Sequence, residues 1–325
     1  MKNTTTRRGF IKQVAATGVG LTIGGMSFKA TSAKSYANII GSNERVNMAV
    51  MGTNGRGAGM ARNFQINKDV EMRYVCDVEE KALAKGVAAV KKAGGNPKTE
   101  KDIRKVLADK NIDAILVTAP DHWHAPATIM ACQAGKHVYC EKPCSHNPHE
   151  GELSLAAARK YNRVVQVGAQ RRSWPGLTEG IEALHNGVIG KVHFAKAWYT
   201  NNRKSIGFGK EMPAPSTIDF DLWQGPAPRR SYRDNLIHYN WHWFWHWGTG
   251  EALNNGTHEI DVVRWGLGLD FPTAVSSEGG RFRYKDDWET PDTQTIDIRF
   301  GDDCLVTWEG RSCNSRDTEG RDRGV

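Results

Sequence analysis

The chain has 325 residues and a formal net charge of +8, but its first 36 residues hold six Lys or Arg and no Asp or Glu. Subtracting these six charges leaves +2, and no later block interleaves Lys or Arg with aromatic residues. The basic balance therefore gives no support for a nucleic-acid partner, and none is expected. The remainder, from about Glu44, is long enough for two domains of about 150 residues each.

The N-terminal region contains Thr6-Arg7-Arg8-Gly9-Phe10-Ile11-Lys12, followed by a weakly apolar, Gly-rich stretch and small residues near Ala33 and Ala37. This pattern is typical of a twin-arginine signal peptide, and the apolar stretch is too short to span a membrane. An ordinary helix is disfavoured by the Gly content. We expect residues 1–37 to be signal and linker, the export machinery to be a partner, and the mature protein to be periplasmic.

Strand and helix patterns alternate from Val46 to Gly168, which predicts a doubly wound parallel sheet. The expected strands are Val46–Met51, Glu71–Cys76, Ile112–Thr118, His137–Cys140 and Val164–Val167. The expected helices are Glu79–Ala93, Glu100–Asp109, Ala125–Ala134 and Pro148–Tyr161, the last with Asn147 as its N-cap. We therefore expect an α/β chain with a Rossmann domain over residues 44–168 and a second domain over residues 169–325.

A Gly-rich turn follows the first strand, and an Asp ends the second. The turn comprises Gly52, Thr53, Asn54, Gly55, Arg56 and Gly57, where Asn54 stands in a position that usually holds Gly but tolerates positive φ. Backbone N–H groups at the next helix start would hold a pyrophosphate. Asp77, twenty residues after Gly57, suits ribose hydroxyls and repels a 2′-phosphate, so NAD is favoured over NADP. A tight turn and a helix cap remain the simpler alternatives.

Polar residues gather at the ends of the fourth and fifth strands, where open α/β sheets bind ligands. Thr118–His124 follows one strand and Glu141-Lys142-Pro143 the other, which marks Lys142 as a catalytic candidate rather than a solvated charge. Asn254 and His258 are spaced to share a helix face, and His258 suits the role of proton acceptor. A packed or capping role for His258 is the alternative.

The densest aromatic run is Trp241–Trp247, in which four Trp would share one face of an extended strand. Most should pack in the core, while one or two line a sugar pocket. Metal binding by His238, His242 and His246 lacks a suitably spaced carboxylate, and no metal is expected. The six Cys show no CxxC, so buried thiols are expected, with one disulfide left open.

The motifs Gly52–Gly57, Asp77, Thr118–His124, Glu141-Lys142-Pro143, Val165–Gly168 and Asn254–Asp261 resemble the glucose–fructose oxidoreductase / inositol dehydrogenase (Gfo/Idh/MocA) family. The resemblance runs from about Glu44 to Glu309 and implies a C-terminal α/β domain with a large, open, mostly antiparallel sheet. It implies cofactor contacts from the Gly-rich turn and Asp77, and also from Pro120, His124, Glu141, Lys142 and Gln170. Lys142, His258 and Asn254 are then catalytic, and the expected substrate contacts are Arg171, Tyr199, His242, Trp243 and His258.

The resemblance implies an NAD(P)-dependent oxidoreductase acting on a secondary hydroxyl of a sugar, cyclitol or glycoside. Asn254 stands where family members often carry Asp, and Asn cannot take a proton. Because no NAD pool exists outside the membrane, we expect the cofactor to be tightly bound and recycled. An NAD-dependent glycosidase or lyase and a non-catalytic sugar-binding homologue are the alternatives. A homo-oligomer is expected, and strands are expected beyond Val325, because family members usually continue.

Overall fold

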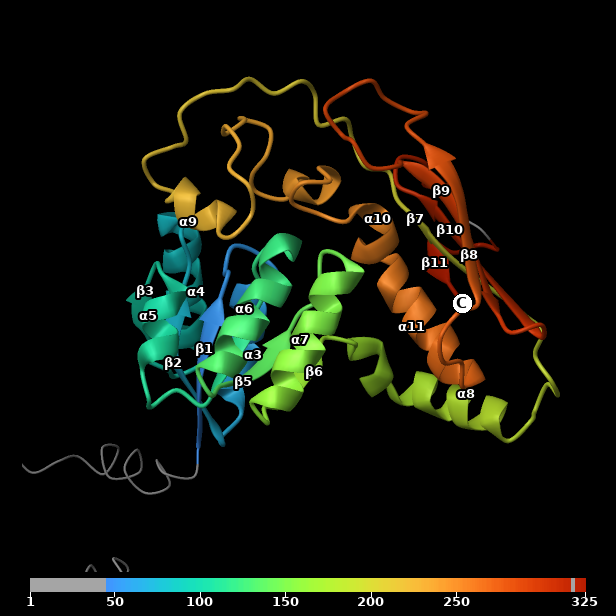
Figure 1. The fold of residues 1–325 in the computed structure, drawn as a ribbon, viewed down its shortest axis with the longest axis horizontal. Coiled ribbons are helices and arrows are strands. Elements are labelled where there is room, and N and C mark those ends of the chain that lie inside the picture. The colour runs from blue at the N-terminus through green and yellow to red at the C-terminus, as the bar shows by residue number, and fades with distance from the viewer. Residues whose placement is uncertain (1–44, 317–318) are drawn as a thin grey trace, which may run out of the picture. The chain divides into compact units, whose positions relative to one another are not determined.

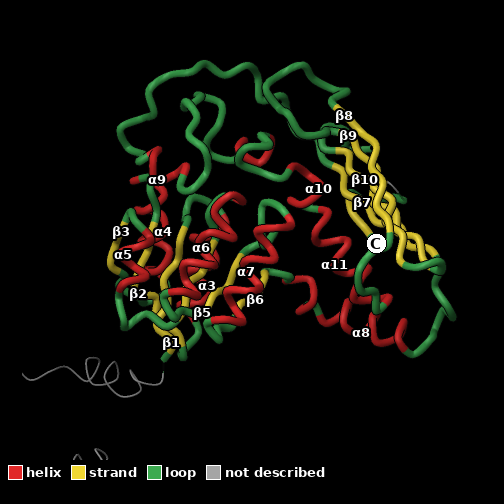
Figure 2. Tube along the Cα trace, viewed as in Figure 1, coloured by secondary structure: helices red, strands yellow, loops and turns green. Residues whose placement is uncertain are grey.

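The computed structural model describes residues 45–316 and 319–325, and the expected signal peptide over residues 1–37 lies outside them. Among the described residues, no helix combines the length and apolarity needed to cross a membrane. The described chain forms two sheets joined by helices and by a long irregular segment (Figures 1 and 2).

The first sheet has six parallel strands in the order β3-β2-β1-β4-β5-β6. Their bounds are β1 Val46–Met51, β2 Val70–Cys76, β3 Lys98–Glu100, β4 Ala114–Val117, β5 His137–Cys140 and β6 Val165–Val167. The expected doubly wound sheet is confirmed. Only β3 was missed, because its three polar residues pair at the sheet edge and show no apolar period.

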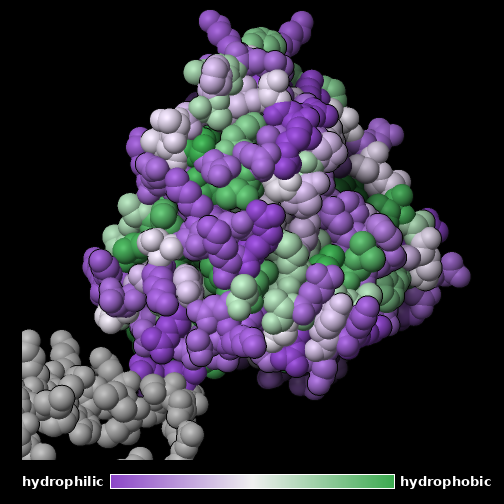
Figure 3. All heavy atoms as spheres, turned by 60° about the vertical axis from the view of Figure 1, so that its left-hand side comes forward, coloured by the Kyte–Doolittle hydropathy of each residue, from purple (hydrophilic) through white to green (hydrophobic). Residues whose placement is uncertain are grey.

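Helices connect these strands: α3 Arg56–Ile66, α4 Glu80–Lys92, α5 Ile103–Ala108, α6 Asp121–Gln133 and α7 Pro148–Lys160. Alternate residues of β1 enter two separate hydrophobic clusters, with Ala49 and Met51 in one and Met48 and Val50 in the other. This alternation is what a strand covered on both faces requires. The outward face of this half is mainly hydrophilic (Figure 3).

Two helix ends differ in what the sequence revealed. α7 begins as expected, because the Asn147 side chain accepts a hydrogen bond from the Glu150 N–H at 3.0 Å. α6 begins at Asp121 rather than at Ala125, and Pro126 lies inside it. The expected helix start at Ala125 was therefore wrong, and the first turn of α6 carries Asp121 and His124 at the carboxyl edge of the sheet.

The second sheet has five strands in the order β11-β7-β10-β9-β8. β7 pairs in parallel with β10, and the other pairs are antiparallel, which confirms the expected, mostly antiparallel second sheet. The strands are β7 Phe194–Thr200, β8 Ala274–Gly280, β9 Thr293–Phe300, β10 Cys304–Arg311 and β11 Arg323–Gly324. The helices of this half are η1 Gln170–Ser173, α8 Pro175–His185, α10 Gly250–Asn254 and α11 Gly256–Leu267. α11 packs on β7 and β10 over a core that includes Trp308.

Residues 201–249, which we call the arm, connect β7 to α10 and contain only the short helices α9 Phe220–Gln224 and η2 Asn240–Trp243. The arm returns to the first sheet, where Ile218 forms a β-bridge with Glu79 and the Trp247 carbonyl accepts the His122 N–H at 3.2 Å. Figure 1 shows it passing above the carboxyl ends of the strands. The arm thus closes one side of the edge where the predicted site residues lie.

Candidate active site

The turn after β1 depends on two glycines. Gly52 has a φ of +87°, and a Cβ there would lie 2.7 Å from the backbone of Ala119. A Cβ on Gly57 would lie 1.8 Å from the Gly52 carbonyl oxygen, so a larger residue cannot fit where α3 meets β1. Asn54 keeps a negative φ, so its tolerance of a positive value is not needed here; Gly52 adopts the positive φ of this turn.

The start of α3 is open to a ligand. Its N-cap residue, Gly55, offers no side-chain hydrogen bond, and nothing lies within 4 Å of a Cβ built on Gly55. The first-turn N–H groups therefore have no side-chain cap, and no acidic residue stands in that turn. Such a helix start attracts phosphate oxygens.

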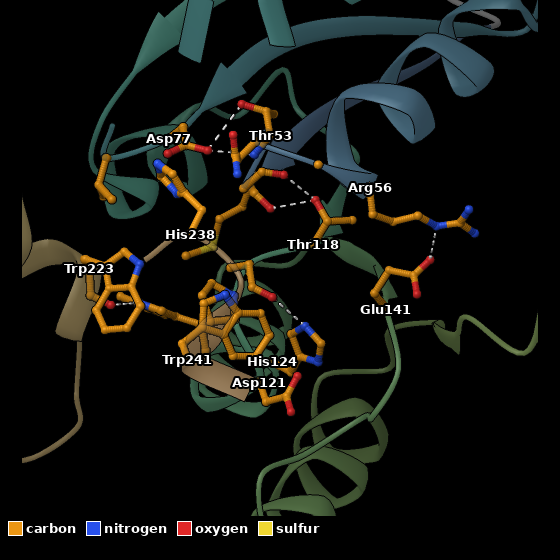
Figure 4. Close-up of a pocket in the computed structure, with 18 of the residues that line it drawn as sticks. Thr53, Arg56, Asp77, Thr118, Asp121, His124, Glu141, Trp223, His238 and Trp241 are labelled. Atoms are coloured by element: carbon orange, nitrogen blue, oxygen red, sulfur yellow. Dashed lines mark hydrogen bonds and ion pairs between the residues drawn. The ribbon is translucent and has the colours of Figure 1, made fainter. Parts of the chain in front are cut away.

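Asp77 follows β2 and faces the same turn. Its carboxylate accepts hydrogen bonds from the Thr53 N–H at 2.6 Å and the Glu79 N–H at 3.0 Å (Figure 4). Burial raises the pKa of Asp77, and these N–H groups oppose the rise. The capping of α4 belongs to Glu79, which accepts the Ala82 N–H at 2.5 Å, so Asp77 is not the cap of that helix.

Lys142 follows β5, and its Nζ reaches across to the end of α10. Nζ donates to the Asn254 side-chain oxygen at 2.9 Å and also to the Asn254 carbonyl oxygen. Burial lowers the pKa of Lys142, while the carboxylates of Asp121, Glu141 and Glu251 act against that shift. Glu141, the residue before Lys142, pairs with the Arg56 guanidinium at 3.2 Å. The structure thus brings Lys142 and Asn254 into direct contact.

A buried carboxylate sets the orientation of Asn254. Glu251 accepts the Asn254 side-chain N–H at 3.3 Å, and its other oxygen pairs with the Arg203 guanidinium at 2.7 Å. Because the amide nitrogen faces Glu251, the amide oxygen faces Lys142. Asn254 carries no negative charge, but the Glu251 carboxylate bonded to its amide does, and Arg203 pairs with that carboxylate.

His258 lies on α11, separated from Asn254 by a break. α10 ends at Asn254 and α11 begins at Gly256, so the expectation of one helix face shared at spacing i, i+4 was wrong. Within residues 45–316 and 319–325, no hydrogen bond involves the His258 ring. Burial, together with the nearby charges of Lys142 and Arg171, lowers its pKa to about 4, so the ring is neutral at neutral pH.

The arm supplies the opposite wall. Figure 4 shows Trp223, His238 and Trp241 facing the side of the cavity that carries Thr53 and Asp77. The His242 ring stacks on Trp241 with centroids 3.6 Å apart. Trp241–Trp243 belong to the 3₁₀ helix η2, which corrects the expectation of an extended run with four Trp on one face.

These walls enclose a cavity of about 460 Å³ that contains most of the predicted cofactor contacts. The predicted residues that line it are Gly52, Thr53, Asn54, Gly55, Arg56, Asp77, Pro120, His124, Glu141, Lys142, Gln170, His242 and Asn254. Its size and mixed walls are those of a small-molecule site.

Five predicted residues do not line the cavity: Gly57, Arg171, Tyr199, Trp243 and His258. Gly57 acts through backbone packing, as described above. Trp243 is buried against Trp288 with ring centroids 4.0 Å apart, and Tyr199 is buried beside Arg203. Arg171 pairs with the buried Glu259 at 2.6 Å. Core packing and ion pairing therefore account for three of the expected substrate contacts.

The cavity residues fit a dinucleotide. The Gln170 side-chain oxygen is buried without a hydrogen-bond partner, although Gln170 lines the cavity. An amide of the cofactor would satisfy the unpaired buried acceptor of Gln170. A pyrophosphate would fit the uncapped helix start, and a ribose would fit the carboxylate beside the turn. In the described part of the chain, no group of three or more His, Cys, Asp or Glu is placed to hold a metal ion.

Comparison with known proteins agrees with this geometry. Residues 46–169 match the family model of the Gfo/Idh/MocA oxidoreductase family, NAD-binding Rossmann fold, and residues 189–320 match that family's C-terminal alpha/beta domain. The chain belongs to the Gfo/Idh/MocA oxidoreductase family. The predicted family and its NAD-binding domain are thereby confirmed.

Named relatives in this family include enzymes of two kinds. A myo-inositol 2-dehydrogenase of Thermotoga maritima is 30% identical over 53% of this chain and 47% of its own length. A glycosyl hydrolase family 109 protein of Saccharopolyspora erythraea is 27% identical over 64% of this chain and 48% of its own. The chain spans about half the length of these curated relatives.

Among solved structures, a levoglucosan dehydrogenase in complex with NADH and levoglucosan has a TM-score of 0.63 and 20% identity, covering 83% of this chain and 67% of its own. GenD2 from gentamicin A biosynthesis, in complex with NAD, has a TM-score of 0.64 and 20% identity, covering 82% and 66%. At this identity the likeness shows the shared fold.

Two site residues of this Gfo/Idh/MocA chain escaped sequence reasoning. Asp121 is buried at the start of α6, where it accepts the Thr249 hydroxyl at 2.6 Å, and Glu251 is buried behind Asn254. Their partners lie far away in the sequence: 128 residues separate Asp121 from Thr249, and 48 separate Glu251 from Arg203. No local pattern signals such pairs. All six Cys are unpaired, with Cys144 exposed and the others buried, so the disulfide left open by the sequence does not form.

Proposed function

We propose that the protein is an NAD-dependent oxidoreductase acting on a secondary hydroxyl of a sugar, cyclitol or glycoside. The observation that carries this proposal is the contact between Lys142 Nζ and Asn254 Oδ1 in the cavity that also contains the Gly-rich turn and Asp77. An amine that can donate a hydrogen bond and, once neutral, accept a proton is thereby fixed beside a dinucleotide-type site.

NAD, when bound, supplies a hydride acceptor for the carbinol carbon. The protein's part is to hold the cofactor and move the hydroxyl proton. The open start of α3 and Arg56 suit the pyrophosphate, and Asp77 suits the adenosine ribose. Lys142 Nζ can donate a hydrogen bond to the substrate oxygen, and its burial eases proton loss. Asn254 positions Lys142 but takes no proton.

The substrate class rests on the relatives and on the wall chemistry. Relatives are named as inositol and levoglucosan dehydrogenases. The cavity wall contributed by the arm presents Trp241, His238 and His242. Aromatic faces pack on the C–H faces of sugar rings, and imidazole nitrogens bond hydroxyls. A carbohydrate is therefore the proposed small-molecule partner.

An NAD-dependent glycosidase or lyase is the second candidate, because several relatives are named glycosyl hydrolase family 109 proteins. In that reaction a hydroxyl is oxidised transiently, the neighbouring C–H is acidified, elimination breaks the glycosidic bond and the hydride returns. The net reaction consumes no NAD, which suits an exported protein.

We also propose that the protein is exported by the twin-arginine route with NAD retained. The pair Arg7-Arg8 supports export, and the arm covering the carboxyl edge of the first sheet supports retention. Replacing both arginines by Lys should retain the protein in the cytoplasm. Mass spectrometry of the denatured, exported protein should detect released NAD; exported protein without nucleotide contradicts retention.

The function itself is tested by adding polyols to the nucleotide-loaded protein. With myo-inositol, D-glucose and methyl β-D-glucopyranoside as probes, at least one should produce the near-ultraviolet absorbance of reduced nicotinamide. Decay of that absorbance without added NAD indicates recycling, and a cleaved glycoside among the products selects the glycosidase candidate. If no probe reduces the cofactor, oxidation of this substrate class is contradicted.

A further inference from the structure

One histidine in the cavity is held in a defined protonation state. The His242 Nδ1 lies 2.6 Å from the Tyr239 carbonyl oxygen. Because a carbonyl only accepts, Nδ1 carries the proton and Nε2 of the neutral ring does not. Tyr239 has a φ of +96°, an unusual backbone conformation for this residue type, and this turn directs its carbonyl at the ring.

The free nitrogen of His242 is available to a ligand. Within the described part of the chain no residue bonds Nε2, and this atom is not fully buried. His242 lines the cavity, and stacking on Trp241 restricts ring rotation. An unprotonated nitrogen is thus available to a ligand on a restricted ring that lines the cavity.

Burial lowers the pKa of His242 to about 4, with Asp121 opposing the shift and Lys142 adding to it. His258 has its pKa lowered to about 4 as well, also with Lys142 as a neighbour. Lys142 therefore has two neutral imidazoles as neighbours: His242 comes from the arm and His258 from α11. Oxidation of a hydroxyl requires one proton acceptor, and the Lys142 amine in its neutral form, which burial favours, can fill that role.

We propose that His242 is a second proton-transfer residue, which removes the proton from the carbon adjacent to the oxidised carbinol. This inference rests on the proposed function. Once the hydroxyl carbon has lost its hydride to bound NAD and the hydroxyl proton has passed to the neutral amine of Lys142, the neighbouring C–H is acidic. Nε2 of His242 takes that proton, and the C–H electron pair forms an enolate. Lys142 is placed to hold the enolate oxygen. Return of the proton from Nε2 restores the ketone.

The alternative role for His242 is recognition of a substrate hydroxyl. A His242→Gln variant separates the two roles, because the Gln amide offers hydrogen bonds but does not accept a proton at neutral pH. His246→Gln is the matched control. His246 lies four residues away on the same arm, its Nε2 contacts the Pro228 carbonyl at 2.7 Å, and it does not line the cavity.

The experiment measures hydrogen exchange in D₂O with the nucleotide-loaded protein and the three polyol probes named above. Mass spectrometry and NMR should find deuterium at the carbon next to the oxidised one, together with reduced nicotinamide. His242→Gln should lower the ratio of exchange to hydride transfer by about 10²-fold, the scale of a general base. His246→Gln should leave that ratio unchanged. Equal loss of exchange and hydride transfer in His242→Gln would reassign His242 to recognition.

The two proposals fail differently. If wild-type protein forms reduced nicotinamide but no deuterated product, the second-base role is wrong and the proposed function stands. If no probe forms reduced nicotinamide, both are overturned. Independently of turnover, nitrogen-15 NMR of the histidines should show a neutral ring with Nδ1 protonated at about pH 7, in a signal that His242→Gln removes. A cationic ring or the other tautomer would overturn the inference.

Discussion

The first sheet and the arm build opposite walls of one cavity in different ways. The sheet positions Asp77 and Lys142 at strand ends whose register is set by backbone pairing and two buried hydrophobic clusters. The arm has no strand within residues 201–249 and only two short helices. It is held by contacts between aromatic rings, such as the edge-to-face contact of Trp223 with Trp247 at 4.9 Å between centroids, and by a few backbone hydrogen bonds to the sheet edge.

The difference suggests a division of labour. Regular strands hold groups that must be placed accurately for hydride and proton transfer, and such elements tolerate little displacement. An irregular, aromatic-rich segment can vary its contacts, as loops that carry specificity do. We therefore expect variants on the sheet to affect chemistry and cofactor choice, and variants on the arm to affect retention and stability.

The largest effect is expected on the sheet side. Lys142→Ala should lower turnover by about 10²-fold or more, the usual scale for a proton-transfer group, because Nζ is the donor fixed beside Asn254. Nucleotide content, measured after denaturation, should stay near wild type. Lys92→Ala, at the exposed end of α4, is the control and should turn over normally. Near-normal turnover in Lys142→Ala would remove Lys142 from the reaction.

An arm variant should show the opposite pattern. Trp223 is buried, stacks on Phe220 and meets Trp247 edge to face, and its carbonyl accepts the Trp123 indole N–H. Trp→Ala in packed surroundings costs about 3–5 kcal/mol, so the arm should open more often. We expect nucleotide to dissociate about 10-fold to 100-fold faster. Trp245→Ala, 55% exposed on the same arm, should not change release. Unchanged release in Trp223→Ala would exclude the arm as a cover.

Contact between arm and sheet should make stability depend on pH. His122 on α6 has a Trp247 carbonyl at Nδ1 and a Trp223 carbonyl at Nε2, yet burial lowers its pKa to about 4. Below pH 6.5, the ordinary pKa of histidine, His122 is protonated in the unfolded chain but stays neutral in the folded chain. The free energy of unfolding therefore falls as pH drops from 6.5 towards 4. At about pH 5 the loss from His122 is about 2 kcal/mol.

Urea unfolding of wild type and His122→Gln at about pH 7 and about pH 5 measures this contribution. The variant should lose less free energy of unfolding between the two pH values than the wild type does. His149→Gln, which is exposed on α7, should behave as the wild type. An equal pH dependence in His122→Gln and wild type would place the acid sensitivity elsewhere.

The same two regions explain what the sequence could predict. The strands around β1 and β5 and the start of α7 depend on local features: apolar runs, Gly52 and Asn147. Lys142 and Asp77 were found because they stand at strand ends in a regular fold. The arm has no hydrophobic period, so its 3₁₀ helix at Trp241 was missed. Trp243 was misplaced because an aromatic residue looks the same in a core and in a sugar site. The roles proposed for individual site residues stay predictions.

The smallest expected effect concerns which cofactor the sheet side selects. Asp77 is a carboxylate at the end of β2 in the cavity wall, and a 2′-phosphate there would meet its negative charge. Asp77→Ala should narrow the preference for NAD over NADP by about tenfold, mainly by improving NADP binding. The variant also leaves the Thr53 N–H without its acceptor, so both affinities should weaken somewhat.

Calorimetric titration of nucleotide-free protein gives the ratio of the two affinities, which cancels this common loss. Asp69→Ala, exposed just before β2, should keep the wild-type ratio, and so should Trp245→Ala on the arm. If the arm variant shifted the ratio as much as Asp77→Ala did, cofactor choice would belong to both walls, and the proposed division of labour would fail at this point.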